Sequence, residues 1–411
     1  MTSSFDIVIV GGGMVGASLG VALAPLGLKV ALVEAVPHDA ATQPSFDERT
    51  TALSNGSRRI LQTLGAWPEV SSAATPIRKI HVSDQGRFGF ARIDAAEQGL
   101  EAMGYVVPNR ALGFALWSRL QAGGAVQIFC PAQVGPITVG EDGVELKILQ
   151  ADGIVTAIDT RLVVAADGVQ SAVRSAFGVD AQVRDYEQTA VITTVLPQRF
   201  HDHVAYERFT GSGPLALLPL EGGRCTLVLT LNRAAADAAM AWSDQEFLAE
   251  LQRRFGFRLG RFLKVGRRVP YPLSLSRATH TSAGRCAIIG NAAQGLHPVA
   301  GMGFNLGLRD VACLAELIAD HHGELSFDAG ARGLLVEYDA WRAADRGGVI
   351  AFTDGLVRLF ANPLGAVQRL RNLGLLAFDL LPPAKASLSR LSSGAGGHAR
   401  VPKLARGVVL Q

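Results

Sequence analysis

The sequence predicts an α/β fold in which a unit of alternating strands and helices is interrupted by an inserted β-sheet and followed by C-terminal helices. Three observations lead to this prediction. Apolar strand-like runs alternate with helical patterns near residues 5–35, 162–176 and 285–319. Short β-branched and aromatic runs separated by turn residues fill residues 185–230. The pattern from Leu334 to about Leu381 is helical, and Pro382 and Pro383 end it.

The first unit begins with Ile7–Val10, a β-branched run typical of a strand that is buried on both faces. Gly11, Gly13 and Gly16 then follow in the spacing G-x-G-x-x-G. In this pattern the first glycine allows a tight turn, the second lets the backbone approach a pyrophosphate, and the third lets the helix pack closely on the strand. The unpaired N–H groups at the start of the helix would then face the phosphates.

A carboxylate ends the next strand of this unit. Residues 30–33 form the second apolar run, and Glu34 follows it, 18 residues after Gly16. A carboxylate at this place accepts hydrogen bonds from a ribose and repels a 2′-phosphate. The unit is therefore predicted to be a Rossmann-like site for FAD or NAD rather than NADP. A signal peptide or membrane anchor is disfavoured, because Asp6 precedes the uncharged run and Pro25 interrupts it.

Composition limits the class of protein. The 411 residues suffice for two or three domains, or for one large α/β unit with insertions. With 48% hydrophobic residues, 18% charged residues and a net charge of +3, the chain is apolar and unsuited to nucleic acid. An apolar substrate, partner or membrane surface would explain this composition. The four cysteines lack metal-binding spacing and are predicted to be core residues in a reducing cytoplasm: Cys130, Cys225, Cys286 and Cys313.

Between the first unit and residue 160, helices and strands alternate. Arg49 precedes a helix that Ser54 or Asn55 would cap; it would contact a pyrophosphate or ribose, or else lie solvated on the surface. Residues 77–93 form two alternating runs around a turn, the pattern of a hairpin. A short strand at 105–107, a helix from Arg110 to Gln121 and several strands in 126–158 follow.

The later segments again show strands followed by turns and helices, as in the first unit. The strand 162–166 ends in Asp167 and Gly168, before a short helix. Another strand, 286–289, ends in Gly290 and Asn291, and a glycine-rich turn at 301–303 opens a helix that continues to about Ala319. The predicted FAD-binding domain is thus discontinuous and comprises residues 1–75, 98–182 and 276–330. The substrate-binding sheet is predicted to comprise 76–97 and 183–275. The C-terminal helices would then span 331–391, and a flexible tail 392–411.

Three segments together resemble a known family: GGGMVG with Glu34, AADGVQSAVR, and GNAAQGLHPVAGMGFNLGLRD. They are similar to the group-A, single-component FAD aromatic hydroxylases of the para-hydroxybenzoate hydroxylase type, and within these to the ubiquinone-biosynthesis hydroxylases. HVSDQG, AYERFTGSGPLALLP and WSDQEFLAELQRRFGFRLG are most similar to the 2-polyprenyl-6-methoxyphenol hydroxylase subgroup. The resemblance covers nearly the whole chain.

The resemblance implies roles for individual residues. Gly11, Gly13 and Gly16 would bind the FAD pyrophosphate and Glu34 the adenosine ribose. Further cofactor contacts are implied for Arg49, Arg110, Asp167, Gly168, Gly290, Asn291, Gly301, Gly303 and Asn305. His297 and Pro298 would line the flavin, with His297 as a structural residue or a base. The sequence departs from the family where Asn291 replaces an aspartate and Met302 replaces a glutamine.

The resemblance also implies the chemistry. NADH or NADPH would reduce FAD, O2 would form a flavin C4a-hydroperoxide, and one oxygen atom would pass to a prenylated phenol. The expected reaction converts 2-polyprenyl-6-methoxyphenol to the 1,4-benzoquinol in ubiquinone biosynthesis; no metal and no catalytic side chain are required. The alternatives are hydroxylation at another ring position or a flavin-bearing scaffold subunit. A prenyl reductase is a further rival, whereas a tryptophan halogenase is disfavoured because no W-x-W motif occurs.

The inserted sheet is predicted to form an apolar wall over the flavin. We expect Phe209 to face the substrate and Arg208 to face away, because neighbouring residues in a strand alternate. The residues predicted to line this wall are Val191, Tyr206, Phe209, Leu215, Leu217 and Pro219. The C-terminal helices, 352–381, would pack onto the FAD domain, or meet a membrane or another protein of the pathway. The predicted location is the cytoplasm, peripheral to the inner membrane face.

Overall fold

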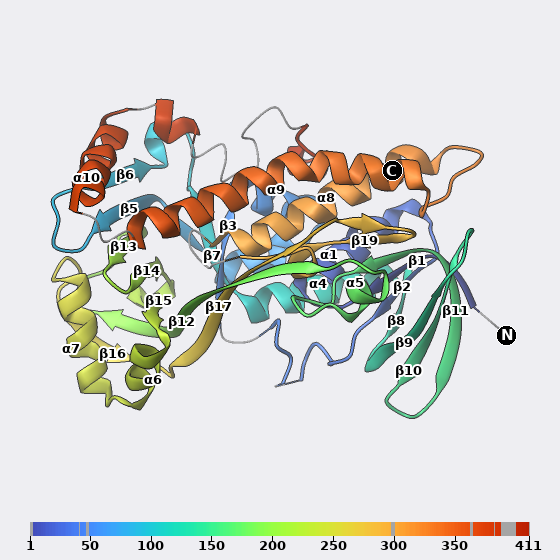
Figure 1. The fold of residues 1–411 in the computed structure, drawn as a ribbon, viewed down its shortest axis with the longest axis horizontal. Coiled ribbons are helices and arrows are strands. Elements are labelled where there is room, and N and C mark those ends of the chain that lie inside the picture. The colour runs from blue at the N-terminus through green and yellow to red at the C-terminus, as the bar shows by residue number, and fades with distance from the viewer. Residues whose placement is uncertain are drawn as a thin grey trace.

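The computed structural model describes residues 3–40, 42–46, 49–296, 301–361, 365–381, 383–387 and 400–410. It is an α/β structure in which a parallel sheet flanked by helices lies at one end and a mainly antiparallel sheet at the other (Figure 1). This arrangement confirms the predicted fold class.

Five parallel strands form the centre of the first sheet, in the order β19-β11-β1-β2-β8. Their bounds are β1 Ser3–Val10, β2 Val30–Val33, β8 Val126–Phe129, β11 Val155–Ala165 and β19 Cys286–Ile288. The remaining members are β9 Ala132–Val139, β10 Val144–Gln150 and β18 Ser282–Ala283. Strand β10 pairs antiparallel with β11. In β1, Ile7 and Ile9 face one apolar core while Val8 and Val10 face another, so the strand is buried on both faces as predicted.

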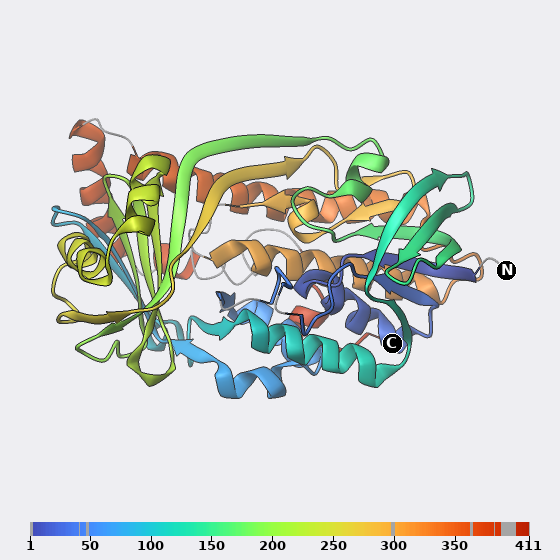
Figure 2. The same cartoon turned by 90° about the horizontal axis from the view of Figure 1, so that it is seen from below.

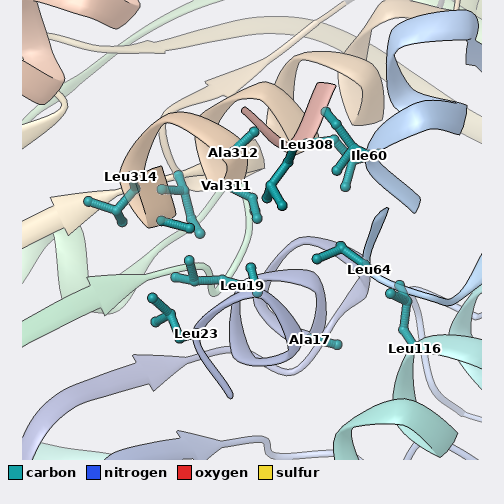
Figure 3. Packing of buried hydrophobic residues seen from close by; sticks show 14 of the residues in the cluster. Ala17, Leu19, Leu23, Ile60, Leu64, Leu116, Leu308, Val311, Ala312 and Leu314 are labelled. Carbon is teal, nitrogen blue, oxygen red and sulfur yellow. The ribbon is translucent and has the colours of Figure 1, made fainter. Parts of the chain in front are cut away.

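Helices cover one face of this sheet. They are α1 Met14–Leu23, α2 Asn55–Thr63, α3 Trp67–Val70, α4 Asn109–Gly123 and α8 Met302–His322. In the core between them, Leu19 and Leu23 of α1 face Leu308 and Val311 of α8 (Figure 3). The opposite face of the sheet is covered by β9, β10 and the short helix α5, Ala172–Ala176. A small sheet of β3 Thr50–Ser54, β7 Gly104–Pro108 and β4 Thr75–Ile77 lies beside this domain.

The inserted sheet is assembled from two distant segments, with the strand order β20-β17-β12-β15-β14-β13-β5-β6 and β16 paired to β12. The first segment provides β5 Lys79–Asp84 and β6 Phe90–Asp94. The second provides β12 Ala181–Pro197, β13 Val204–Thr210, β14 Gly213–Pro219, β15 Cys225–Asn232, β16 Phe262–Val265 and β17 Val269–Ala278, and β20 is Gln294–Gly295. Strands β12 and β17 form a long ribbon that joins this sheet to the parallel-sheet domain (Figure 2).

Two helices cover the outer face of the inserted sheet, α6 Arg233–Ala241 and α7 Asp244–Phe255. Ser243 caps α7 and Glu246 completes a capping box. The C-terminal helices are α9 Arg332–Ala361 and α10 Gly365–Leu380. Helix α9 starts on α8, whereas α10 packs on β6 of the inserted sheet (Figure 1). The prediction that these helices pack onto the FAD domain is therefore wrong for α10. Within the described residues, no helix is long and apolar enough to cross a membrane.

Residues 400–410 are packed against the parallel-sheet domain, so the predicted flexible tail is wrong for this part; 392–399 and 411 lie outside the described residues. Leu404 and Leu410 are buried in the main core. Arg400 and Lys403 form ion pairs with Asp320 near the end of α8, and Arg400 also pairs with Glu316. These apolar and charge contacts account for the attachment of this segment.

Candidate active site

A cavity of about 1490 Å³ lies between the parallel-sheet domain and the inserted sheet, and the end of α9 and helix α10 form part of its wall. Ligand pockets for single small molecules measure roughly 300–1,000 Å³. The volume is therefore sufficient for a dinucleotide and a second molecule together. Its lining includes predicted residues from both domains, namely Gly11, Gly13, Glu34, Arg49, Asp167, Gly168, Asn291, Gly301, Gly303, Asn305, Tyr206 and Phe209.

The three glycines of the first turn have different structural roles. Gly11 has a φ of +105°, and a Cβ there would lie 2.5 Å from the carbonyl oxygen of Ala166. A Cβ on Gly16 would lie 1.8 Å from the carbonyl oxygen of Gly11, which explains why helix α1 packs so closely on β1. Gly13 instead lines the cavity, and a Cβ there would meet only the side chain of Ser45. Gly16 supports the turn from behind and does not itself line the cavity.

The N-terminus of α1 is open to the cavity. Gly13 is its N-cap residue and provides no side-chain hydrogen bond, and no acidic residue lies in the first turn. The first N–H groups of a helix lack partners within the helix and carry the positive end of its dipole. This end of the cavity therefore suits an anion such as a pyrophosphate.

Glu34 lies at the end of β2 with its carboxylate held in place. Its Oε2 accepts a hydrogen bond from the Gly12 N–H at 2.5 Å, and its Oε1 accepts one from the Val36 N–H at 2.9 Å. The side chain lines the cavity beside the glycine turn. A carboxylate fixed here is well placed for a ribose hydroxyl.

Asp167 lies just after the end of β11, which pairs with β1 on the side opposite to β2. Its Oδ2 accepts a hydrogen bond from the Val173 N–H at 3.2 Å, whereas its Oδ1 is buried without a partner among the described residues. Buried acceptors usually have a donor, because desolvation is costly otherwise. A bound ligand with a hydroxyl or amide donor would satisfy this oxygen. Together with the uncapped helix end, this observation shows that the residues present fit FAD.

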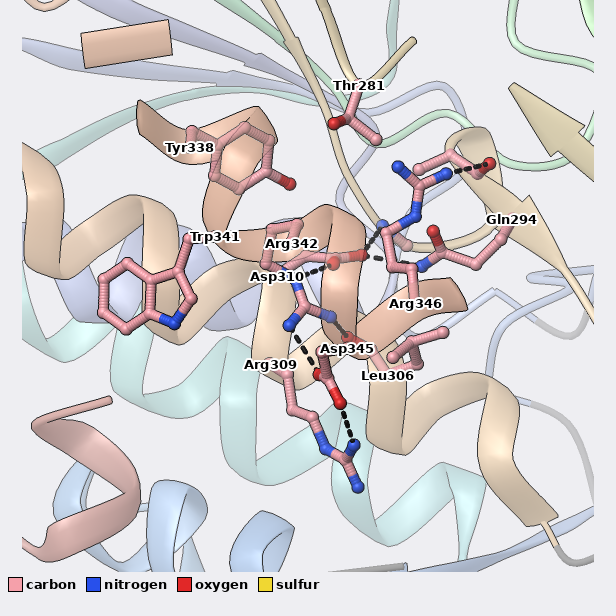
Figure 4. A network of polar contacts seen from close by, with 12 residues as sticks. Thr281, Gln294, Leu306, Arg309, Asp310, Tyr338, Trp341, Arg342, Asp345 and Arg346 are labelled. Carbon is pink, nitrogen blue, oxygen red and sulfur yellow. Dashed lines mark hydrogen bonds and ion pairs between the residues drawn. The ribbon is translucent and has the colours of Figure 1, made fainter. Parts of the chain in front are cut away.

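A network of buried charges supports the Gly290 turn, and the sequence analysis missed it (Figure 4). Gly290 has a φ of +59° and does not line the cavity. Its N–H donates to Asp310 Oδ2 at 2.9 Å, and Gln294 Nε2 donates to the same oxygen at 2.7 Å. The charge of Asp310 is compensated by Arg342, whose Nε donates to Oδ1 at 2.7 Å. Asp310 thus fixes the backbone that presents Asn291 to the cavity.

The network continues away from the cavity through a second carboxylate. Asp345 bonds to Arg342 at 2.6 Å and to Arg309 at 2.9 Å. Burial alone would raise the pKa of Asp345, but these two guanidinium groups hold it below its usual value. The sequence signal was the pair Arg309–Asp310 inside an otherwise apolar stretch of α8, because charged residues are rarely fully buried unless paired.

Asn305 braces the glycine-rich turn that opens α8. Its Oδ1 accepts a hydrogen bond from the Ser54 N–H, and its Nδ2 donates to the carbonyl oxygens of Ala52 and Gly301. Gly301 has a φ of +60°, which favours glycine. Asn305 therefore joins β3 to the turn in addition to lining the cavity. His297 and Pro298 lie outside the described residues.

The two predicted arginines lie in different environments. Arg49 lines the cavity, donates to the carbonyl oxygen of Pro44 at 2.8 Å and lies over the ring of Tyr271. Arg110 is exposed in the first turn of α4 and does not line the cavity, so the structure does not place it at the predicted cofactor site. The preceding residue, Asn109, is buried and lines the cavity instead, where its Oδ1 accepts from Thr51 Oγ1 at 2.7 Å. The helix begins one residue earlier than predicted.

The inserted sheet contributes a different set of wall residues from the one predicted. Phe209 lines the cavity and stacks on Phe360 of α9 with ring centroids 3.4 Å apart. Arg208 faces away and donates to the Arg254 carbonyl oxygen of α7. Tyr206 borders the cavity, but it pairs with Leu217 and its ring packs edge-on against Phe255 in the core beneath α7, so the prediction that it forms the cavity wall is wrong. The residues that line the cavity across the middle of the sheet are Ala91, Val82, Glu207, Ala216, Val228 and Ile192.

Besides Tyr206, four predicted wall residues lie on the opposite face of the sheet. Val191, Leu215 and Leu217 pack in the core beneath α6 and α7, and Pro219 has the same parity in β14. Side chains along a strand point alternately to the two faces of the sheet. An error of one residue in which positions face inward therefore moves every predicted side chain of that strand to the other face. The sequence did not determine the parity, since one face meets the helices, the other meets the cavity, and both are apolar.

Comparisons with known proteins agree with this geometry. The family model described as FAD binding domain matches residues 4–352. Ubiquinone hydroxylase UbiL of Rhodospirillum rubrum is 40% identical over 98% of this chain and 93% of the relative. The 3-demethoxyubiquinol 3-hydroxylase of Escherichia coli is 31% identical over 91% of this chain and 94% of the relative.

A solved structure shows the same fold. The p-nitrophenol 4-monooxygenase PnpA from Pseudomonas putida superposes with a TM-score of 0.79, covering 97% of this chain and 100% of that chain at 19% identity. The family match extends over both domains, and the match to the solved structure covers 97% of the chain. The chain belongs to the FAD-dependent monooxygenase family of ubiquinone-biosynthesis hydroxylases.

Proposed function

We propose that this chain hydroxylates a polyprenylated phenol in ubiquinone biosynthesis, converting 2-polyprenyl-6-methoxyphenol to the 1,4-benzoquinol with O2 and NADH or NADPH. The observation that carries the proposal is the continuity of one cavity from the glycine turn to an apolar sheet. The relatives named above are ubiquinone-pathway hydroxylases, which supports the substrate class. Hydroxylation of another ring position and a scaffold role for a flavin-bearing subunit are the alternatives.

The FAD end of the cavity would hold the cofactor through backbone and carboxylate groups. The N-terminus of α1 with Gly13 suits the pyrophosphate, Glu34 suits the ribose, and Asp167 offers a free acceptor. The other predicted cofactor contacts that line the cavity are Gly11, Arg49, Gly168, Asn291, Gly301, Gly303 and Asn305. When bound, FAD supplies the activation of O2 and the transfer of one oxygen atom. The chain itself binds the ring, orients it and excludes water.

The substrate end suits an uncharged ring with an apolar tail. Arg371 of α10 is the arginine that lines this end among the described residues, and its charge is compensated by Asp84 of β5. The wall nearby is formed by apolar residues of α9 and α10, including Phe352, Leu356 and Phe378. A carboxylated ring would need a cation available for pairing. A prenylated phenol needs none, and its tail can pack against these helices.

We expect Phe209→Ala to uncouple the enzyme. The substitution removes a ring that is 3% exposed and stacked on Phe360, which opens a path for water between β13 and α9. FAD should still bind, while H2O2 released per NAD(P)H oxidised should rise severalfold and product should fall. Parallel assays of peroxide, NAD(P)H and product test this, with Phe257→Ala, an exposed ring away from the cavity, as the control. Equal coupling in both variants would contradict the assignment of Phe209.

We further propose that α10 meets the membrane surface and thereby gives a prenylated substrate access to the cavity. Leu373 and Leu380 are 56% and 79% exposed, while Leu375 and Phe378 of the same helix line the cavity. Leu373→Ser with Leu380→Ser should reduce flotation with liposomes without changing FAD content. Leu263→Ser, an exposed leucine of the inserted sheet, is the matched control. Undiminished flotation of the double variant would refute the membrane contact and leave a protein partner for α10.

Profiling of quinone intermediates in a deletion strain tests the proposed reaction. Cells without this protein should accumulate a prenylated phenol that lacks the new hydroxyl group. Accumulation of a different ring intermediate would support the first alternative. Full rescue by a variant that cannot bind FAD would support the scaffold alternative.

A further inference from the structure

Glu207 is the one acidic residue in the row of side chains that crosses the cavity face of the inserted sheet. Within β13 it lies between Ala205 and Phe209, which face the same way. In the register of the sheet, Glu207 lies opposite Val82 of β5 and Ala216 of β14. The row continues to Ala91 on one side and to Val228 and Ile192 on the other. A carboxyl group thus stands in the middle of an otherwise apolar wall.

This carboxyl group has no structural partner among the described residues. It forms no hydrogen bond or ion pair with the rest of the described chain, unlike the buried carboxylates of Asp310 and Asp84. Burial raises the pKa of Glu207 to about 7. An ionisable group that lines a cavity, lacks a structural partner and has a pKa shifted by desolvation is a candidate functional residue.

Other charged groups nearby are already engaged or face elsewhere. On β5, His81 points to the opposite face, where it bonds to Arg258, and on β13 Arg208 bonds to α7. From α10, Arg371 reaches Asp84. Arg49, Glu34 and Asp167 line the FAD end of the cavity. The protonation state of Glu207 is therefore governed by burial and by what binds in the cavity.

We propose that the Glu207 carboxylate accepts a hydrogen bond from the ring hydroxyl of the bound phenol and excludes rings that carry a carboxylate. This inference rests on the proposed function and assigns the polar contact that orients the ring. A phenol has a pKa of about 10, well above that of Glu207, so the proton remains on the phenol oxygen in the bound ground state. A second carboxylate in the same desolvated wall would meet like-charge repulsion.

The test is a binding titration of the FAD-loaded enzyme, followed by the perturbation of flavin fluorescence. The probes are 2-methoxy-6-prenylphenol, its methyl ether and 3-prenyl-4-hydroxybenzoate. At pH 8 the wild type should bind the phenol roughly ten-fold more tightly than the ether, as expected for a hydrogen bond to a charged acceptor. Glu207→Met should abolish this preference, and Glu207→Gln, whose amide still accepts a hydrogen bond, should retain part of it.

Two further comparisons isolate the carboxylate. At pH 6 the wild-type preference should shrink, because the carboxyl is then mostly neutral, whereas Glu207→Met should show no change with pH. The benzoate should bind Glu207→Gln at least ten-fold more tightly than it binds wild type at pH 8. The control is Asp237→Asn, which removes one negative charge, as Glu207→Gln does, but from an exposed position on α6. This variant should bind all three probes as the wild type does.

The outcomes separate the inference from the proposed function. An unchanged phenol-to-ether ratio in Glu207→Met, with the phenol still bound, overturns the role of Glu207 alone. Failure of the FAD-loaded wild type to bind any prenylphenol overturns both.

Discussion

Gly13→Val is expected to abolish FAD binding while leaving the fold intact. A Cβ at this position would lie 2.9 Å from Ser45 Oγ, the end of a small side chain that can move. The two remaining carbons of valine would occupy the cavity in front of the α1 N-terminus, where backbone and pyrophosphate must approach closely. We expect a loss of affinity for FAD of at least about 100-fold, or roughly 2.7 kcal/mol.

The matched control for Gly13→Val is Gly123→Val. Gly123 ends α4, and a Cβ there would have no atom within 4 Å. After removal of FAD, the free energy of unfolding of each variant in urea should lie within about 1 kcal/mol of that of the FAD-free wild type. Only Gly13→Val should purify without the yellow cofactor. A normal flavin spectrum in this variant would show that the glycine turn is not the pyrophosphate site.

Asp310→Ala is expected to have the largest effect on stability. The substitution would leave Arg342 as a buried charge without its main partner and would remove the acceptor of the Gly290 N–H (Figure 4). Breaking a buried ion pair from one side costs about 3–5 kcal/mol. The turn that presents Asn291 should also loosen, so any folded fraction should bind FAD more weakly.

Urea unfolding of the FAD-free protein measures this cost. Asp159→Ala removes an exposed carboxylate from β11 and should change the free energy of unfolding by less than about 0.5 kcal/mol. Asp310→Asn, which keeps an acceptor for Gly290, should fall between the two. If Asp310→Ala were as stable as Asp159→Ala, the network would not be the support of the turn that we describe.

The elements of the parallel-sheet domain could be predicted because their signals are local. Gly16 is fixed by its close approach to the Gly11 carbonyl oxygen a few residues earlier, and Glu34 by its place at a strand end. In both cases the residues that determine the conformation lie within the first strand–helix–strand unit.

The remaining features depend on contacts between distant segments. The inward face of the inserted sheet is set by β5 and by α9 and α10, far from β14 in the sequence, so Leu215 and Leu217 were placed on the wrong face. Asp310 acquires its role only when α9 brings Arg342 to it. Glu207 likewise becomes notable only once its neighbours across the sheet are known to be apolar.

The most direct test of the central claim is the oxygenation of a prenylphenol by the purified, FAD-loaded protein. The assay supplies NADH or NADPH, 18O2 and 2-methoxy-6-prenylphenol, and mass spectrometry follows the ring product. We predict a hydroxylated product with one labelled oxygen atom, formed in step with NAD(P)H oxidation. Stronger stimulation of NAD(P)H oxidation by a carboxylated benzoate, or a folded FAD-loaded protein that forms no labelled product, would contradict the proposed function.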